Sequence, residues 1–484
     1  MYVQTHSHAK TVSKSRPSRT VLSAAAMIGI FIVVLWAGAC KNSPDDMETA
    51  PDWYVPDDFG SIGGAIGNAV AGDTIFVASG TYSENISLKD GVTLLGEDRD
   101  TTIIEGGGGD AAVSSAGCGA DTVIDGFTIT KGGGMMAGGM YNYNSSVTVR
   151  NCSFPANRAD KGGGMHNSGG SPTIENCVFS GNTGIGAYNS GAGMYNVGSS
   201  PTISGCIFEN NVAAKGTDNW TGRGGGMYNE DCANVTIDGC VFRGNQAGNS
   251  PGYNYGLGYG CGMYNENSTV TLTDCSFMYN RDADSSGLPT TPGGGIYNTS
   301  GTDCTLINCV FVANSSSYGT LNGSSGSTST LYNCTFCSNE AVGGVLYIGG
   351  TLTVYNSILW DNNFCDYPSD PARIIRNEGG TITITYSNVE GGYSGTGNID
   401  VDPQFVVYPS YTPNVPGDIA TSWYTSTSQD FGNLRLLSGS PCIDTGNNSD
   451  VPSGTATDID GRPRILDGPD PDSTAIVDMG AYEY

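Results

Sequence analysis

The residues best suited to catalysis are carboxylates, and they occur in two short acidic sequences. Cleavage of a glycosidic bond needs two carboxyl groups at a fixed separation, and calcium binding needs several oxygen ligands. The sequence Arg-Asp-Ala-Asp at 281–284 makes Arg281, Asp282 and Asp284 candidate catalytic residues. The sequence Asp-Ile-Asp-Gly at 458–461 begins like a calcium loop, so Asp458 and Asp460 are candidate Ca²⁺ ligands. In a chain this acidic, the alternatives are a chance surface pair and an ordinary turn.

Other groups give little support for a catalytic site. Carboxylates that recur at one strand position in neighbouring repeats would form a cluster. The positions beside each Gly-Gly-Gly-Met-Tyr-Asn sequence carry Gly, Tyr and Asn, so we expect no such cluster. His166 is the one histidine after residue 39, and it replaces a repeat tyrosine, which indicates a structural substitution. We therefore predict no cofactor, with Ca²⁺ as the only metal considered.

Four aromatic residues suggest a surface for sugar rings. Trp220, Tyr253, Tyr255 and Tyr259 fall in three long insertions, 212–223, 246–259 and 281–292, which follow the same position of consecutive repeats. Flat apolar rings among Gly, Asn and Ser suit a neutral polysaccharide. Stacked repeats would bring these insertions side by side, so we predict one ligand-binding surface. The alternative is that exposed loops contain tyrosine by chance, since the chain has 26 of them.

A repeated motif must position these residues. The sequence [Asn/Gly/Asp]-Cys-x-Phe occurs seven times, at intervals of 25 to 35 residues. Each copy follows a Gly-rich Met-Tyr-Asn sequence or a variant of it and an alternating strand, and an Asn comes three residues after the Phe. Because Asn, Gly and Asp tolerate left-handed backbone conformations, we expect a bend before each Cys. The phenylalanines are Phe154, Phe179, Phe208, Phe242, Phe277, Phe311 and Phe336.

Repeats of this length predict a stack of β-coils. Alternate residues of a strand share a face, so Cys152 and Phe154 point to the same side. Stacking would place equivalent residues about 4.8 Å apart, and each buried Phe would contribute about 1.5–3 kcal/mol. We therefore predict an all-β fold, a right-handed parallel β-helix over 55–390. A short N-terminal helix formed by the apolar residues of 62–70 and an irregular segment, 391–484, would cap its ends.

The cysteines divide into two sets. We expect the seven repeat cysteines to be buried free thiols, because Cys is a compact apolar residue. The others are better candidates for disulfides in an oxidising compartment. These are Cys118, Cys232, Cys261, Cys304, Cys337, Cys365 and Cys442.

Residues 1–39 have the features of an export signal. A basic stretch precedes an apolar run from Val21 to Ala37, and Ala-Gly-Ala-Cys follows at 37–40. This sequence resembles the lipobox of bacterial lipoproteins, which implies that Cys40 is lipidated and that 40–54 form a tether. The protein would then lie at the outer membrane or cell surface, held to the membrane by its lipid alone. An ordinary signal peptide and a membrane anchor are the alternatives.

The formal net charge of −27 restricts the partners. Nucleic acid is excluded because its phosphates would be repelled. A neutral polysaccharide or cell-surface glycan is compatible with this charge, and we expect the chain to be a monomer.

Three further resemblances bear on architecture. The repeats over about 132–362 resemble those of polymorphic outer membrane proteins, and residues 55–82 resemble the first coil of pectin-lyase-like β-helices. The sequences at 402–405, 440–444, 458–464 and 478–484 resemble the choice-of-anchor Q segment of bacterial surface proteins. These resemblances imply a non-catalytic surface protein that is adhesin-like or contacts carbohydrate. A polysaccharide lyase or glycoside hydrolase of the pectin-lyase-like class is the first alternative, and a structural coat component is the second.

Overall fold

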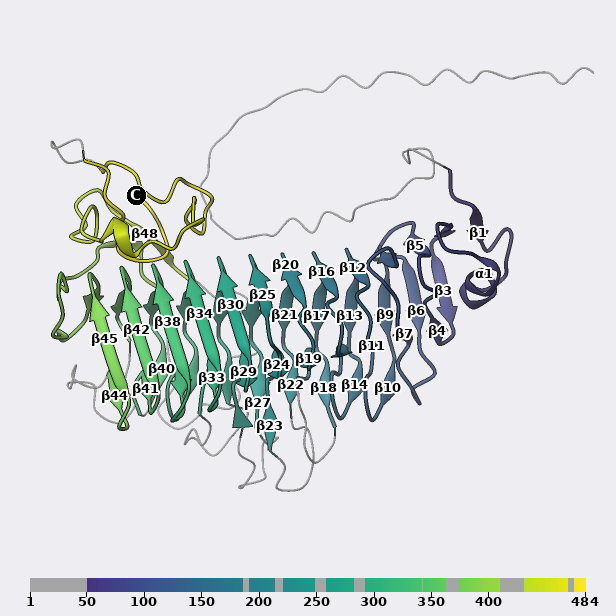
Figure 1. Ribbon diagram of the computed structural model, residues 1–484, viewed down its shortest axis with the longest axis horizontal. Helices are drawn as coiled ribbons and strands as arrows, with labels where there is room; N and C mark the ends of the chain where they lie inside the picture. Colours follow the sequence, from purple (N-terminus) through teal and green to yellow (C-terminus); the bar gives the residue numbers. More distant parts are fainter. Residues whose placement is uncertain are drawn as a thin grey trace, which may run out of the picture. The chain divides into compact units, whose positions relative to one another are not determined.

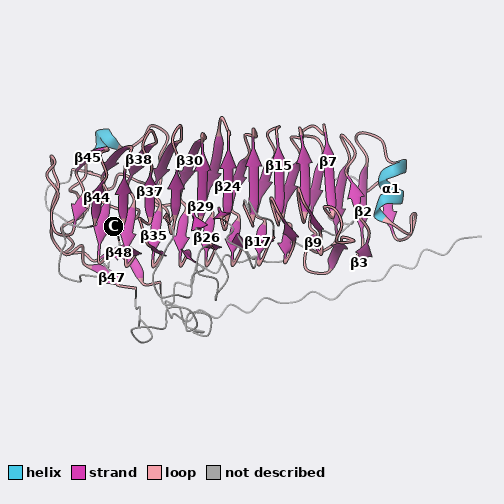
Figure 2. Ribbon diagram, turned by 90° about the horizontal axis from the view of Figure 1, so that it is seen from below, coloured by secondary structure: helices cyan, strands magenta, loops and turns pink. Residues whose placement is uncertain are grey.

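The fold is a parallel β-helix, built of coils that each add one strand to several sheets (Figure 1). The computed structural model describes residues 50–185, 191–213, 221–248, 258–282, 292–341, 343–362, 374–409, 431–468 and 474–484. Every strand pair of the four large sheets is parallel, and Figure 2 shows their successive strands side by side with the helix α1 at one end.

The two largest sheets have 13 and 12 strands in the described residues. The 13-stranded sheet contains β1 (Trp53–Val55), β2 (Thr74–Val77), β5 (Thr93–Gly96), β8 (Val123–Asp125), β12 (Thr148–Arg150), β16 (Thr173–Glu175), β20 (Thr202–Ser204), β25 (Val235–Asp238), β30 (Thr269–Thr273), β34 (Asp303–Ile307), β38 (Thr328–Tyr332), β42 (Thr351–Tyr355) and β45 (Thr381–Thr385). The 12-stranded sheet contains β3 (Gly80–Ser83), β6 (Thr102–Glu105), β9 (Thr128–Thr130), β13 (Ser153–Pro155), β17 (Val178–Ser180), β21 (Ile207–Glu209), β26 (Val241–Arg243), β31 (Ser276–Met278), β35 (Val310–Val312), β39 (Thr335–Cys337), β43 (Ile358–Trp360) and β46 (Asn388–Val389).

Two further parallel sheets complete the coils. The 11-stranded sheet contains β4 (Ile86–Ser87), β7 (Val113–Ala116), β11 (Met140–Tyr143), β15 (Met165–Ser168), β19 (Met194–Val197), β24 (Met227–Glu230), β29 (Met263–Glu266), β33 (Ile296–Asn298), β37 (Leu321–Gly323), β41 (Leu346–Ile348) and β44 (Ile375–Asn377). The 8-stranded sheet contains β10 (Gly133–Gly134), β14 (Arg158–Ala159), β18 (Thr183–Gly184), β22 (Val212–Ala213), β27 (Gln246–Ala247), β32 (Arg281–Asp282), β36 (Ser315–Ser316) and β40 (Glu340–Ala341). The small pairs are β23 (Gly222–Arg223) with β28 (Gly258–Tyr259), parallel, and β47 (Phe405–Val407) with β48 (Asn433–Leu436), antiparallel.

The repeated phenylalanines form the predicted internal stack. Strand pairing aligns all seven from Phe154 to Phe336. Neighbouring ring centroids are 4.3 to 4.8 Å apart and their planes differ by only 3 to 5°. The residue before each repeat Cys has φ between 50 and 60°, which confirms the predicted left-handed bend.

Two rows of buried asparagines run through the same coils. In one row the side-chain amide of each Asn donates 2.7 to 2.8 Å hydrogen bonds to the amide oxygen of the next, from Asn142 to Asn298. Ser115 donates to Asn142 at one end, and Asn298 donates to Ser329 at the other. The Asn three residues after each Phe forms the second row. These bonds satisfy polar groups that would be costly to bury unpaired.

The N-terminal end of the core is covered by α1 (Ile62–Asn68). Ser61 caps the helix by accepting a hydrogen bond from the backbone N–H of Gly64. Ile62, Ala65 and Ile66 are buried in the core, as predicted, whereas Val70 lies beyond the helix and is exposed. Among the described residues, no helix has the length and hydropathy needed to cross a bilayer.

The C-terminal segment packs against the outside of the last coils. Its Phe405, Leu436 and Met479 form an apolar cluster with Val310 and Ile358 of the 12-stranded sheet. The 3-10 helix η3 (Asn448–Asp450) lies in this segment, and backbone bonds tie the segment to the coils, as when the Ala481 N–H donates to Thr335 Oγ1. The boundaries 55–390 and 391–484 remain predictions.

A group of buried charges lies within the C-terminal segment. Arg464, Glu483, Asp478 and Asp458 are each no more than 2 % exposed. Arg464 Nη1 lies 3.7 Å from Glu483 Oε2, and Arg464 Nη2 donates to the carbonyl oxygens of Asp478 and Gly480. Burial raises the pKa of Glu483 to about 8 and that of Asp478 to about 6, and a neighbouring carboxylate, Asp478 for Glu483 and Asp444 for Asp478, acts in the same direction.

The expectation of disulfides outside the repeat row is wrong for the described residues. The thirteen described cysteines are all buried and none of them forms a disulfide, and Cys365 lies outside the described residues. Cys118 and Cys232 occupy corner positions where neighbouring coils have serine, and their N–H groups donate to Ser145 Oγ and Ser268 Oγ. These cysteines therefore have serines, not cysteines, as neighbours. The repeat cysteines are free thiols, as predicted.

Candidate functional site

A row of aromatic side chains runs along the outer face of the 11-stranded sheet. In each Met-Tyr-Asn sequence the Met and Asn point into the core, so the residue between them points outward. Centroids of neighbouring rings are 4.7 to 5.4 Å apart. This row, which we call the tyrosine row, consists of Tyr141, His166, Tyr195, Tyr228, Tyr264 and Tyr297.

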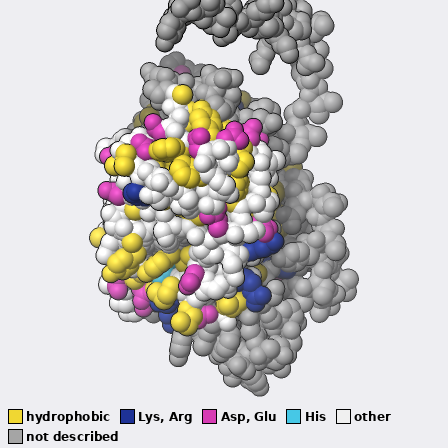
Figure 3. Space-filling model, turned by 90° about the vertical axis from the view of Figure 1, so that its right-hand side faces the viewer, with side chains coloured by type: hydrophobic (Ala, Val, Ile, Leu, Met, Phe, Trp, Pro, Cys, Tyr) yellow, Lys and Arg dark blue, Asp and Glu magenta, His cyan; other side chains and the backbone are white. Residues whose placement is uncertain are grey.

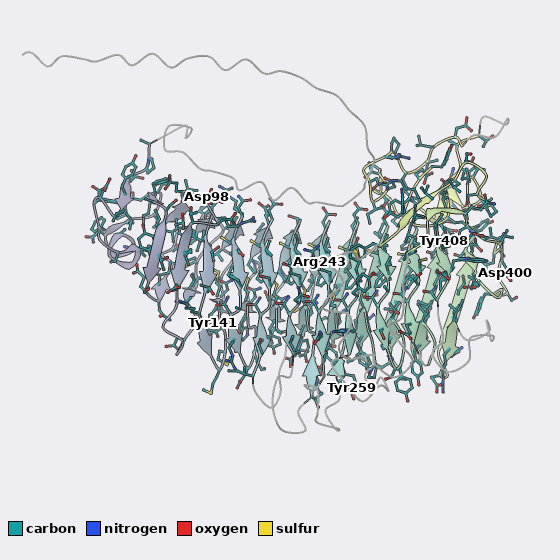
Figure 4. The ribbon with its side chains drawn as sticks, turned by 180° about the vertical axis from the view of Figure 1, so that it is seen from behind. Asp98, Tyr141, Arg243, Tyr259, Asp400 and Tyr408 are labelled. Carbon is teal, nitrogen blue, oxygen red and sulfur yellow. The ribbon has the colours of Figure 1, made fainter. Side chains whose placement is uncertain are left out.

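The tyrosine row is accessible at its ends and covered at its centre. Tyr195, Tyr228 and Tyr264 are buried, whereas Tyr141 and Tyr297 are half-buried. Tyr143, on the strand of Tyr141, is 49 % exposed. Figure 4 shows Tyr141 and Tyr259 toward one side of the stack and Asp98 and Tyr408 toward the other. A ligand on this face would thus meet aromatic groups at both ends of the row.

Two carboxylates lie directly above one another on this face, contrary to the expectation that no carboxylates recur. Glu230 and Glu266 follow Met-Tyr-Asn in consecutive coils, and strand pairing places them opposite each other. The Met-Tyr-Asn motif ends at the Asn, one residue before each of these glutamates, so the motif does not include them. Because they lie two residues after Tyr228 and Tyr264, both point outward. Neighbouring coils are separated by about 4.8 Å, so the two carboxylates form a pair.

Each carboxylate of the pair accepts a hydrogen bond from a tyrosine of the preceding coil. The Tyr195 hydroxyl donates to Glu230 Oε2, and the Tyr228 hydroxyl donates to Glu266 Oε2. Burial, together with these bonds to a carboxylate, raises the pKa of both tyrosines well above the usual value. Both phenols therefore remain protonated donors that orient the carboxylates.

Two basic groups complete this cluster. Arg223 of β23 lies with Nη1 3.7 Å from Glu266 Oε2, and its guanidinium is 5.5 Å from the Tyr264 ring centroid. Lys161 Nζ lies 3.1 Å from the Tyr195 hydroxyl oxygen. The side chains of Arg223 and Glu266 are each 39 % exposed, so this ion pair is open to solvent. The cluster offers a ligand acceptors, donors and ring faces together.

His166 has a structural place in the row, as predicted. It stacks between Tyr141 and Tyr195, and its Nδ1 lies within hydrogen-bonding distance of the Met136 carbonyl oxygen. Burial lowers its pKa to about 4. The imidazole is therefore neutral near pH 7.

The predicted loop surface is described only in part. Tyr259, in β28, lies 5.2 Å from Tyr297 between ring centroids and so extends the tyrosine row. β28 pairs with β23, so the ends of two insertions are adjacent. Trp220, Tyr253, Tyr255 and Cys40 lie outside the described residues.

The candidate catalytic sequence at 281–284 is also described only in part. Arg281 lies in β32, between Gln246 of β27 and Ser315 of β36. The side chain of Asp282 and all of Asp284 lie outside the described residues. Their proposed role in catalysis stays a prediction.

Asp458 and Asp460 form a turn whose oxygens already have protein partners. Asp458 accepts backbone N–H bonds at 2.8 to 2.9 Å from Asp460, Arg462 and Glu483, and the Asp460 carboxylate lies 2.5 Å from Arg435. This geometry favours the turn interpretation. Among the described residues, no group of three or more His, Cys, Asp and Glu side chains is placed to hold a metal ion.

The surface at the α1 end shows how charge is distributed on the coils. Figure 3 shows acidic side chains scattered among uncharged and hydrophobic ones on that face. This agrees with the low share of charged residues in the chain, 14 %.

Comparisons with known proteins bear on the fold. Residues 82–311 match a family model described as right handed beta helix region. No curated protein matches the chain in sequence. A crystal structure of the pectate lyase Pel9A is 13 % identical with a TM-score of 0.44, covering 87 % of this chain and 90 % of that one. A pectin methylesterase from carrot is 12 % identical with a TM-score of 0.36, covering 55 % and 84 %.

A third solved structure is a tailspike of an Acinetobacter phage. It is 11 % identical with a TM-score of 0.39, covering 71 % of this chain and 62 % of that one. We base the fold assignment on the strand pairing and the family match, which give both the parallel coils and their hand. The chain therefore contains a right-handed parallel β-helix, as the repeats predicted.

Proposed function

We propose that this chain is an exported surface protein that binds carbohydrate along its tyrosine row. The observation that carries the proposal is the accessible part of this row: Tyr141 with Tyr143 at one end, Tyr297 at the other, and the ion pair of Arg223 with Glu266, which is open to solvent. Sugar rings stack on aromatic faces, and charged and amide groups beside them bond to sugar hydroxyls. Lipidation at Cys40 and an adhesin-like role are further parts of the proposal, supported by the N-terminal sequence and the repeats.

Removing the accessible rings should weaken binding of soluble glycans. In Tyr141→Ala/Tyr143→Ala and in Tyr297→Ala we expect the Kd to rise about tenfold, because each lost ring contact is worth about 0.5–1.5 kcal/mol. Purified full-length protein would be screened against plant and bacterial polysaccharides, and the Kd of a soluble hit measured by calorimetry. The matched control is Tyr332→Ala/Tyr355→Ala, an outward stacked pair on the 13-stranded sheet. Equal affinity in all variants would contradict the proposal.

The carboxylate pair favours a second candidate function, hydrolysis of a glycosidic bond. Retaining glycosidases hold two carboxyl groups about 5–5.5 Å apart, close to the spacing of adjacent coils, about 4.8 Å. In this function the carboxylate of Glu266, which pairs with Arg223, would attack the anomeric carbon while the carboxyl group of Glu230 gives a proton to the leaving oxygen. Water would then release the sugar from Glu266, with Glu230 taking the proton of the water.

Activity and binding are separated by one assay. If the chain is a hydrolase, the polysaccharide panel will show new reducing ends, and Glu266→Gln will lower the rate at least 100-fold, as loss of a catalytic carboxylate does. Glu175→Gln, on the 13-stranded sheet, is the matched control. Binding with no new reducing ends would favour the non-catalytic function. Unsaturated products that require Ca²⁺ would instead identify a lyase.

A further inference from the structure

One outward position of the 13-stranded sheet is threonine in almost every coil. Strand pairing aligns this position through twelve successive strands, from β2 to β45. The single exception is Val123, whose branched side chain has the same shape as that of threonine. We call these residues the threonine file. They are Thr74, Thr93, Thr148, Thr173, Thr202, Thr236, Thr271, Thr305, Thr330, Thr353 and Thr383.

The array is two rows wide over the last coils. In the strands β30, β34, β38, β42 and β45, a second outward row lies two residues before the threonine file. Figure 1 shows these strands side by side along the stack. Four of the five positions of this row are threonine and the fifth is aspartate: Thr269, Asp303, Thr328, Thr351 and Thr381.

Strand propensity alone does not explain this uniformity. Threonine is favoured in strands, but so are Val, Ile and the aromatic residues. The corresponding outward file of the 12-stranded sheet, one residue before the stacked Phe, is mixed in composition. Its members outside the contact with the C-terminal segment are Ser153, Val178, Ile207, Val241 and Ser276, which are Ser, Val and Ile in no fixed order. The same coils thus vary this position on one face and hold it constant on another.

The hydroxyl groups of the threonine file are available to a partner. Thr202 and Thr383 are exposed and the other threonines of the file are half-buried. Within the described file, Thr148 alone donates a side-chain hydrogen bond, a long one of 3.4 Å to the Ala120 carbonyl oxygen. The remaining hydroxyls are neither satisfied by the protein nor removed from solvent.

Charge narrows the choice of partner. No member of the file is charged, although Arg150, Glu175 and Asp238 lie on the same strands two residues later. The chain as a whole carries a net charge of −27, which repels polyanions. The threonine file itself, with its methyl and hydroxyl groups and no charge, therefore complements an uncharged, hydroxyl-bearing partner, and Asp303 is the single charged position of the second row.

The geometry points to the ordered face of a crystalline, uncharged β-1,4-linked polysaccharide as that partner. The coils present one threonine about every 4.8 Å, and the two rows lie about 6.6–6.8 Å apart along the strands. Sugars of an extended β-1,4-linked chain repeat at a slightly longer distance than the coils, so several neighbouring coils, though not the whole stack, stay in register with them. A rigid array loses little entropy on contact, so many weak matched contacts add up. This surface is separate from the tyrosine row and does not depend on its function.

Retention on two physical forms of one polymer tests the assignment. Full-length protein would be mixed with microcrystalline cellulose and with acid-swollen cellulose, whose chains are the same but disordered. We expect retention on the crystalline form at least tenfold greater than on the swollen form. Thr173→Lys/Thr236→Lys/Thr305→Lys should lose this retention at least tenfold. The corresponding Val variants, which keep side-chain shape and strand preference, should lose it severalfold because the hydroxyls are absent.

The control variant carries three lysines on another face, the 12-stranded sheet: Ser153→Lys/Ser180→Lys/Ser276→Lys. It should bind crystalline cellulose as the unmodified protein does. Circular dichroism and the denaturation midpoint would establish that each variant is folded. The assignment is overturned by equal retention on both forms, by no retention on the crystalline form, or by either threonine set binding like the unmodified chain. Soluble-glycan affinity, read on the same variants, reports the tyrosine row separately.

Discussion

Phe242→Ala should lower the free energy of unfolding by about 3–5 kcal/mol, the range for removing a fully buried aromatic ring. Phe242 is 0 % exposed, and its ring lies 4.8 Å from that of Phe208 and 4.6 Å from that of Phe277. The stack is tight on both sides, so the coils cannot close the cavity without breaking the register of the strands. Chemical denaturation followed by circular dichroism measures this loss.

The matched control is the next residue of the same strand. Arg243 points outward, is about half exposed and pairs with Glu209 across coils. An exposed pair of this kind contributes about 0–1 kcal/mol, so Arg243→Ala should shift the denaturation midpoint little. If the two variants were equally destabilised, the phenylalanine stack would not be the core of the coils.

Raising the pH from 5 to 9 should destabilise the C-terminal segment. The pKa values of Asp478 and Glu483 are raised by burial to about 6 and about 8, above their unfolded values of 3.8 and 4.5. For acids whose pKa is raised, the stabilisation is complete below the unfolded pKa and is lost as the pH rises through the folded pKa. The loss should therefore extend from about pH 4 to about pH 8. A tenfold change in proton affinity corresponds to about 1.4 kcal/mol, so the total is on the order of a few kcal/mol.

The thermal midpoint across this range measures the effect, and Glu483→Gln isolates its cause. Glutamine keeps an oxygen that can accept from the Leu466 and Asp478 N–H groups but does not ionise. The variant should show a shallower fall in midpoint above pH 6 than the unmodified protein. Identical slopes in both proteins would place the pH dependence elsewhere. Hydrogen exchange would show whether the segment opens first, as locally weaker units do.

The fold could be predicted because each coil repeats the same pattern of buried, exposed and bend residues. The period-two pattern around Cys and Phe predicted which face of the strand is buried. The Asn, Gly or Asp before each Cys predicted the bend. A second left-handed corner after the Phe was not predicted. It is formed by Ala156, Tyr279 and Ala313 among others, with φ of 52 to 55°. Only Gly181, Asn210 and Gly244 among the seven repeats carry a residue type that favours that region at this corner, so the signal there is weaker than before each Cys.

The candidate site was harder to predict because its chemistry is not part of the repeat. The position after Met-Tyr-Asn is Val197, Glu230 and Glu266 in successive coils, so only two coils supply a carboxylate. A motif defined by what the coils share excludes that variable position. The proximity of the two acids becomes visible only when the coils are placed in register. Of the four aromatic residues predicted from the long insertions, Tyr259 is described and contacts Tyr297, and its role in ligand binding stays a prediction.

The buried asparagine row has a direction, because every amide donates toward the C-terminal end of the stack. The first asparagine of such a row needs a donor for its amide oxygen, and the last asparagine needs an acceptor for its amide N–H group. Hydroxyl groups, which can do both, provide these ends at Ser115 and Ser329. A coil could therefore be duplicated or lost within the row without leaving an unpaired amide, whereas loss of either serine-bearing coil would leave one. Within the part of the solenoid that this row spans, repeats can thus be gained or lost between the two serine-bearing coils.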